Sequence, residues 1–264
     1  MAVESPSRVA RDAAFVTRMR ALRDFTSARV DLGIAGDSLP LKALLDFRVA
    51  HARARDTVHF PLDSNSMLQE CAQRGWPARI IHSTANDRSE YLQRPDKGRV
   101  LDSISAAEVA AVDSGPSLLF VIADGLSALA IHRHALPLLE IVFRHLKFEP
   151  AETNPVWIAT EARVAIADHV GGLLDASLSV LLIGERPGLS APDSLGIYLT
   201  WQPKRGRTDA ERNCISNVHS GGLSHEEAAH RLLFLIEESR RRQISGVTLK
   251  ETAGPPLLGA SDTL

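Results

Sequence analysis

The stretch that decides the fold runs from residue 117 to residue 146 and reads SLLFVIADGLSALAIHRHALPLLEIVFRHL. Its beginning, residues 117–124, is an almost continuous apolar run, which is typical of a strand buried on both faces of a sheet. From residue 127 onward, apolar side chains recur every three or four positions, and this spacing predicts a helix that reaches residue 146. A buried strand followed directly by a helix is the repeating unit of a parallel sheet covered by helices.

The same alternation continues towards the C-terminus. We expect further strands at 156–160, 179–185 and 196–202, and further helices at 164–176 and 224–243. The last helix opens with the capping box Ser224-x-x-Glu227. The predicted fold class is therefore α/β, with a Rossmann-like, mostly parallel sheet that helices cover.

The sequence before this region predicts a mainly helical part. Pro40 opens an apolar-periodic helix towards residue 58, a second helix is expected at 64–75, and a short helix at 105–112 has Ser105 as its expected cap. We divide the chain into an amphipathic N-terminal extension at 1–27, a mainly helical domain at 28–115, an α/β domain at 116–251 and a tail at 252–264.

Composition excludes several classes of protein. The 264 residues include 44% hydrophobic and 23% charged residues, which are ordinary globular values. Lys and Arg number 30 against 32 Asp and Glu, and this balance disfavours a general nucleic-acid binder. No apolar run approaches the roughly 18 residues of a membrane span. Because we find no secretory leader, we expect Cys71 and Cys214 to be free thiols in a reducing compartment.

Ligands of open parallel sheets bind at the carboxyl ends of the strands, so the loops after the predicted strands are the candidate sites. These loops are 123–127, 184–190 and 203–209. None contains GxGxxG or GxxxxGK[ST], which disfavours simple NAD or ATP binding. Ser127 lies in GLSAL, which resembles a nucleophile elbow except at its last position; a helix cap is the favoured role for this serine.

Two other polar groups attract attention. His132 and His134 are two positions apart and should point to different faces of a helix, which favours a solvated or partner-facing role over metal binding. Residues 206–224 form the densest polar cluster, in which we expect Thr208 or Asp209 to cap a short helix that carries Cys214. This cluster is either a ligand or interface site, or a packed turn in which Cys214 acts as a small apolar residue.

Several of these segments, taken together and in order, resemble the light chain of ethanolamine ammonia-lyase, an adenosylcobalamin-dependent enzyme. The segments are LLFVIADGLSALAIHRHA, LLIGERPGLSAPDSLGIYLT and GRTDAERNCISN, preceded by LPLKALLDFRVAHARARDTVH and followed by GGLS with a long helix. The resemblance covers residues 28–251.

The resemblance implies a non-autonomous small subunit. It implies assembly with a TIM-barrel large subunit as a hexamer of heterodimers, with adenosylcobalamin held between the two chains. It implies the radical deamination of ethanolamine to acetaldehyde and ammonia, with the substrate bound mainly by the partner. Carried over residue by residue, the cobalamin contacts fall on Val164, Glu185 and Cys214, and no residue of this chain is implied to be catalytic or to bind a metal.

The sequence also bears on the cobalt ligand and on the location of the protein. The string DHVGG at 168–172 lacks the spacer of the Asp-x-His-x-x-Gly motif, so we expect the cofactor's own benzimidazole to stay on cobalt. The resemblance implies a cytoplasmic enzyme or one inside a bacterial microcompartment, and residues 8–23 form either an encapsulation tag or an ordinary extension. The alternatives are a non-catalytic α/β scaffolding protein and an α/β hydrolase that uses Ser127.

Overall fold

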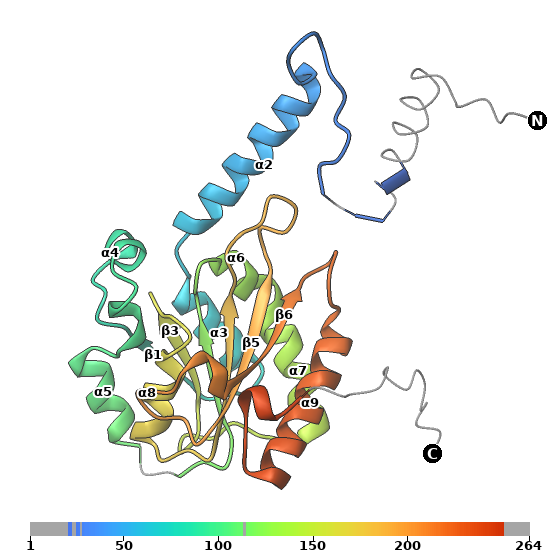
Figure 1. The fold of residues 1–264 in the computed structure, drawn as a ribbon. Helices are drawn as coiled ribbons and strands as arrows, with labels where there is room; N and C mark the ends of the chain where they lie inside the picture. The colour runs from blue at the N-terminus through green and yellow to red at the C-terminus, as the bar shows by residue number, and fades with distance from the viewer. Residues whose placement is uncertain (1–20, 23–24, 27, 113–114, 251–264) are drawn as a thin grey trace, which may run out of the picture. The chain divides into compact units, whose positions relative to one another are not determined.

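The computed structural model describes residues 21–22, 25–26, 28–112 and 115–250 (Figure 1). The chain divides into two compact units, residues 1–54 and residues 55–264. Apart from 21–22 and 25–26, the expected N-terminal extension lies outside the described residues, as does the expected tail at 252–264. The domain limits that we drew at residues 27, 115 and 251 stay predictions.

The described elements alternate between helices and strands. In chain order they are α2 (Leu41–His59), α3 (Ser64–Gln73), β1 (Ala78–His82), α4 (Arg88–Gln93), α5 (Ser103–Ala110), β2 (Leu119–Ala123), α6 (Ala128–Ala130), α7 (Leu136–Leu146), β3 (Val156–Thr160), α8 (Ile166–Leu173), β4 (Leu178–Gly184), β5 (Leu195–Trp201), β6 (Arg212–Val218) and α9 (His225–Arg242). Short 3₁₀ turns lie at Lys97–Arg99, Asp209–Glu211 and Gly246–Thr248.

The strands form one sheet in the order β1-β3-β2-β4-β5-β6. β1, β3, β2 and β4 run parallel to one another, whereas β5 is antiparallel to both β4 and β6. The predicted α/β class with a mostly parallel sheet is therefore confirmed. At β5 the chain direction reverses. The C-terminal end of β5 therefore lies at the end of the sheet where the parallel strands begin.

The two outer strands of the sheet were not predicted. β1 lies in a part of the chain that we expected to be mainly helical, and β6 occupies residues for which we expected helical turns. The expectation of a helix around Cys214 is wrong, because β6 pairs with β5 along Thr200↔Arg212 to Leu195↔Val218. Backbone pairing outweighs local preference here, and Asn, Cys, Ile and Val are weak helix formers in any case.

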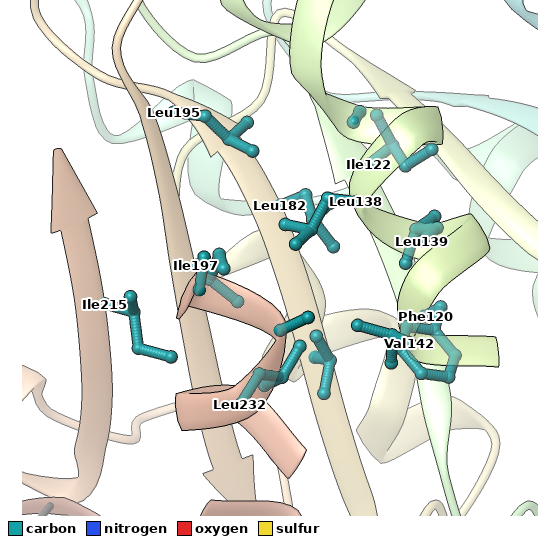
Figure 2. Close-up of a cluster of buried hydrophobic side chains, with 14 of the residues drawn as sticks. Phe120, Ile122, Leu138, Leu139, Val142, Leu182, Leu195, Ile197, Ile215 and Leu232 are labelled. Atoms are coloured by element: carbon teal, nitrogen blue, oxygen red, sulfur yellow. The ribbon is translucent and has the colours of Figure 1, made fainter. Parts of the chain in front are cut away.

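Both faces of the sheet are covered by helices within the unit 55–264. Side chains alternate between the faces along each strand. On one face, Phe120, Ile122 and Leu182 pack with residues of α7 and α9 (Figure 2). On the other face, Val121 and Leu181 pack with residues of α5 and α8. This burial on both sides is the physical reason why β2 and β4 read as continuous apolar runs.

The predicted helix at 127–146 forms with an interruption. The start α6 and the main part α7 are joined by a π-helical turn at Ile131–Ala135. Pro137 follows this turn, and its ring nitrogen cannot donate the hydrogen bond that a regular helix would place on the carbonyl of Arg133. α7 ends at Leu146, and the next residue, Lys147, adopts a left-handed conformation with φ 50°.

The short helix that we expected at 105–112 begins two residues earlier. Asp102 is its cap, and the Asp102 carboxylate accepts a 2.6 Å hydrogen bond from the amide of Ser105. The Ser105 hydroxyl instead accepts a 2.9 Å hydrogen bond from the amide of His82 in β1. The cap that we assigned to Ser105 is therefore wrong, because this hydroxyl ties α5 to the sheet.

Candidate functional site

The three residues singled out by the resemblance lie along one strip of the unit 55–264. Val164 and Glu185 line a cavity of about 260 Å³ together with Tyr198 of β5. Cys214 of β6 lies directly opposite Tyr198 in the strand register. Ser216, two residues further along β6, hydrogen-bonds Glu185. We call Val164, Glu185, Tyr198, Cys214 and Ser216 the open strip, because Cys214 and Ser216 are exposed.

The Glu185 carboxylate is held in one orientation. Its Oε2 accepts hydrogen bonds of 2.5 Å from the Ser194 hydroxyl and 3.2 Å from the Asn217 amide. Its Oε1 accepts a 2.5 Å hydrogen bond from the Ser216 hydroxyl. Gly196 leaves room for the side chain, since a Cβ there would lie 3.1 Å from Oε1. No lysine or arginine in the described part of the chain forms an ion pair with Glu185.

Cys214 and Tyr198 form an uncharged pair beside this carboxylate. Cys214 is exposed as a residue, but desolvation by the surrounding atoms raises the pKa of its thiol; a hydrogen bond with Tyr198 opposes the rise and the nearby Glu185 adds to it. Burial also raises the pKa of Tyr198. Both groups are therefore protonated at neutral pH. A thiol of this kind is a poor nucleophile, and the pair is suited to contact a ligand rather than to attack it.

Val164 lies on a loop that a buried carboxylate anchors. Asp124, directly after β2, accepts 2.9 Å hydrogen bonds from the amides of Glu161 and Ala162. Arg88 pairs with Asp124 at 3.0 Å and with Glu161 at 3.1 Å. Burial raises the pKa of Asp124 to about 7, against the opposing effect of Arg88. Asp124, which lies in the predicted loop 123–127, thus positions the loop that carries Val164.

Ser127 serves as a cap. Its hydroxyl accepts a 3.2 Å hydrogen bond from the amide of Ala130 and donates a 2.9 Å bond to the carbonyl of Pro192. The side chain is fully buried. The favoured capping role is confirmed, and a buried hydroxyl committed to two backbone groups is not available as the nucleophile of a hydrolase.

The two histidines of the HxH pair diverge as expected. His132 Nε2 accepts a 3.2 Å hydrogen bond from the amide of Asp63, whereas His134 Nδ1 lies 3.0 Å from His225 Nε2. Of the two expected roles, the solvated one is wrong for His134, which is 8% exposed because His225 of α9 covers it, and the partner-facing one stays a prediction. Across the described ranges, no three His, Cys, Asp or Glu side chains are grouped closely enough to hold a metal ion.

The third predicted loop lies elsewhere. Pro203 to Asp209 follows β5, and β5 runs antiparallel, so this loop leaves the edge of the sheet opposite to the loops at 123–127 and 184–190. It then packs on α8, where a Cβ on Gly171 would lie 2.3 Å from Cγ of Pro203. Thr208 caps the turn Asp209–Glu211, as predicted, and its amide donates a 2.7 Å hydrogen bond to Glu211.

Sequence reasoning from the residues alone missed Val164 and Tyr198. Val164 has no chemical signal, and only its place in the loop between β3 and α8 marks it. Tyr198 is recognisable only as the partner of Cys214 across β5 and β6. Both cysteines are free, as expected. None of the described helices combines the length and the apolar character needed to cross a lipid bilayer.

The fold and the open strip define an α/β protein with a row of exposed and half-buried side chains along one part of its sheet. The family "Ethanolamine ammonia-lyase light chain (EutC)" matches residues 17–250. The chain is 53% identical over 236 residues to the ethanolamine ammonia-lyase small subunit of Pseudomonas fluorescens, which covers 88% of this chain and 86% of the relative. It is 51% identical over 245 residues to that of Ralstonia nicotianae, with 91% of each chain covered. The chain belongs to the ethanolamine ammonia-lyase light-chain family.

Proposed function

We propose that this chain is the small subunit of an adenosylcobalamin-dependent ethanolamine ammonia-lyase and that the open strip forms its contact with the cofactor. One observation carries the proposal. Val164, Glu185 and Cys214 come from three separate segments, yet Tyr198 links them, since it lines the cavity of the first two and faces the third. The family membership of the chain supports the same activity.

The residues of the strip fit a corrin. A corrin ring is large and carries amide groups around its edge, so it needs hydrogen-bond acceptors and neutral contacts from the protein. Glu185 offers a carboxylate that only hydroxyls and an amide hold, without a competing cation among the described residues. Cys214 and Tyr198 offer neutral surface beside it. Amide N–H groups can donate to such a carboxylate without displacing an internal ion pair.

The bound cofactor supplies the radical chemistry that turns ethanolamine into acetaldehyde and ammonia. The residues of this chain bind and orient the cofactor and exclude water from it. Asp124 holds the loop of Val164 in place, and the strand pairing of β5 with β6 places Cys214 beside Tyr198. We assign no catalytic residue and no metal ligand to this chain.

We propose that the cofactor would keep its own benzimidazole on cobalt and that no histidine of this chain would replace it. Nδ1 of His169 accepts a 3.0 Å hydrogen bond from the amide of Leu101, which commits this nitrogen inside the chain. Burial lowers the pKa of His169. Electron paramagnetic resonance of the cob(II)alamin form with nitrogen-15-labelled protein tests the assignment. Superhyperfine coupling that changes with the protein label would refute it.

We further propose that a TIM-barrel large subunit is the partner, in a hexamer of heterodimers, and that the partner binds most of the substrate. We also propose that the enzyme is located in the cytoplasm or in a bacterial microcompartment. Deletion of residues 1–26 tests whether the N-terminus directs the protein to a shell. Unchanged co-sedimentation with purified shells rules out an encapsulation tag.

The central test uses the complex of this chain with its large subunit. Titration with hydroxocobalamin, followed by visible absorbance, should show stoichiometric uptake by the unmodified complex. The double variant Glu185→Ala, Cys214→Ser should bind the corrinoid at least tenfold more weakly. Glu108→Gln, on the exposed side of α5, is the matched control and should bind normally. Equal affinity of the double variant overturns the assignment of the strip.

The assignment of the chain as a subunit has its own test. Ammonia release by the large subunit alone, at the rate of the complex, would contradict it. Failure of the complex to take up any corrinoid would instead favour a non-catalytic α/β scaffolding protein. The hydrolase alternative predicts esterase activity of the isolated chain that Ser127→Ala abolishes, and the burial of Ser127 argues against it.

A further inference from the structure

A second cavity lies on the other side of Val164, between the beginning of α8 and the segment that leads into β6. Its volume is about 430 Å³. Four arginines line it, Arg99, Arg163, Arg207 and Arg212, with Asp209 as its acidic residue. Because Arg163 and Val164 also line the cavity of the open strip, the two cavities are neighbours. The function proposed for the open strip assigns no role to this arginine cavity.

Two of the four arginines are neutralised within the chain. Arg212 is 7% exposed and pairs with the buried Asp168 and, at 2.7 Å, with Asp209. Arg207 pairs with Glu211 at 2.5 Å. Even so, the Nε of the buried Arg212 has no hydrogen-bond acceptor among the described residues. A buried N–H group without an acceptor costs free energy, which a bound ligand atom recovers.

The other two arginines have no acidic partner in the described part of the chain. Arg163 stacks on Tyr91, with its guanidinium carbon 4.1 Å from the ring centre, and donates a 3.3 Å hydrogen bond to the Tyr91 carbonyl. Its Nε is likewise without an acceptor. Arg99 is exposed at the rim and takes part in no ion pair with a described acid. The cavity therefore keeps an excess of positive charge.

The beginning of α8 adds to this field. Ala165, its N-cap residue and a wall of the cavity, has no side chain that can accept from the first amides of the helix. The amides of Ile166 and Ala167 instead donate to the carbonyls of Arg163 and Val164, so the helix start contributes only the positive end of its dipole. The two guanidinium groups without an acidic partner, and the Nε–H groups of Arg163 and Arg212 without an acceptor, favour a ligand with acceptor oxygens.

We propose that this cavity binds the phosphate group of a larger molecule. Arginine forks match phosphate oxygens in pairs, and several forks around one group favour a tetrahedral oxyanion over a planar carboxylate. The cavity is within the range of roughly 300–1,000 Å³ that is typical of sites for small molecules and cofactors. It is thus larger than a bare phosphate ion requires, so an ester with an attached organic group is the better fit. The phosphodiester of the cofactor and a free nucleotide are two sources of the same chemistry.

The test uses the complex with the large subunit and three probes. Hydroxocobalamin contains a phosphodiester, cobinamide is a corrinoid without it, and AMP is a free phosphate ester. The variants are Arg99→Gln and Arg163→Gln, and Arg144→Gln, an exposed arginine of α7, is the matched control. Arg99→Gln changes an exposed side chain, so it keeps the test valid if Arg163→Gln fails to fold.

Two results support the proposal. A loss of about tenfold in the hydroxocobalamin affinity of Arg99→Gln, with cobinamide affinity unchanged, identifies the cofactor's phosphodiester as the occupant. Arg163 also lines the cavity of the open strip, so Arg163→Gln is judged by its binding of AMP. A similar loss in the binding of AMP to the cofactor-free complex, measured by calorimetry, identifies a free phosphate ester. The control should bind all three probes like the unmodified complex.

Two results overturn it. Unchanged affinity for both hydroxocobalamin and AMP shows that the arginines bind no phosphate. An equal loss for cobinamide and hydroxocobalamin shows contact with the corrin instead. If the unmodified complex takes up neither corrinoid, the proposed function fails, while the AMP measurement still decides the present inference.

Discussion

The hydroxyl of Ser216 on β6 donates a 2.5 Å hydrogen bond to Oε1 of Glu185, which follows β4, although β5 lies between these two strands in the sheet. The bond reaches across β5 at Gly196, where the absence of a side chain leaves space for the carboxylate. The edge strand of the sheet and the loop after β4 therefore share one hydrogen-bonded carboxylate. This link gives the open strip a defined shape before any ligand binds.

The first prediction concerns this link. Ser216→Ala removes one of the donors that orient Glu185, and hydroxocobalamin affinity of the complex should fall by about five- to tenfold, as expected for one hydrogen bond to a charged group. The thermal midpoint should change little, because Ser216 is exposed. Ser220→Ala, an exposed serine in the turn after β6, is the control. Unaltered affinity in Ser216→Ala would show that Glu185 needs no support from β6.

The two thiols should differ in reactivity. Cys71 is fully buried and its pKa is raised to about 11, whereas Cys214 is exposed. Iodoacetamide should therefore modify one thiol per native chain, slowly at pH 7 and faster as the pH rises, since the pKa of Cys214 is also raised. Peptide mass spectrometry identifies the site. Cys214→Ser should remove the reaction, and bound hydroxocobalamin should slow it; preferential modification of Cys71 would contradict the structure.

A buried ion pair should carry much of the stability of α8 against the sheet. Asp168 and Arg212 pair with side chains that are 2% and 3% exposed. Asp168→Asn leaves a buried guanidinium short of one counter-charge and should lower the free energy of unfolding in urea by about 3 kcal/mol. Asp209→Asn alters the exposed partner of the same arginine and should have little effect. Equal losses in the free energy of unfolding for the two variants would contradict the expectation that the buried pair contributes more than the exposed one.

Stability should fall in mild acid because of His134. Burial lowers its pKa, as does the neighbouring His225, while Asp193 at 3.5 Å opposes the shift and Arg133 adds to it. A histidine with a lowered folded-state pKa binds fewer protons than the unfolded chain, so stability is lost as the pH falls below the ordinary value of 6.5. In His134→Gln, the free energy of unfolding in urea should differ less between pH 7.5 and pH 5.5 than it does in the unmodified protein. A larger difference in the variant would reverse this sign.

The contact of β4 with the start of α6 should not tolerate a methyl group. A Cβ on Gly184 would lie 2.1 Å from the carbonyl oxygen of Ser127 and 2.6 Å from that of Asp124. Gly184→Ala should therefore lower the free energy of unfolding by about 3 kcal/mol and weaken corrinoid uptake, since Glu185 follows directly. Gly115→Ala, with nothing within 4 Å of the added carbon, is the control. Matching thermal midpoints of the two variants would contradict the close approach.

Particular elements show which signals a single sequence contains. β2 and β4 were predicted because both of their faces are buried, so their apolar runs are local and continuous. α9 was predicted from its capping box, which forms through Ser224 and Glu227. β1 and β6 were not, because the outer strands carry mixed polar and apolar residues and their pairing partners lie far away along the chain.

The sequence by itself determined the α/β class, the buried strands, most helices and the resemblance that points to Val164, Glu185 and Cys214, because burial periodicity and motif order are local properties of the chain. Only the tertiary structure decided the reversal at β5, the outer strand β6 and the meeting of Glu185 with Ser216 and of Cys214 with Tyr198. It also decided that Arg99 and Arg163 face the same cavity as Arg212. The physical reason is that these contacts join residues far apart in the chain, and their geometry follows from strand order and direction, which no local pattern encodes.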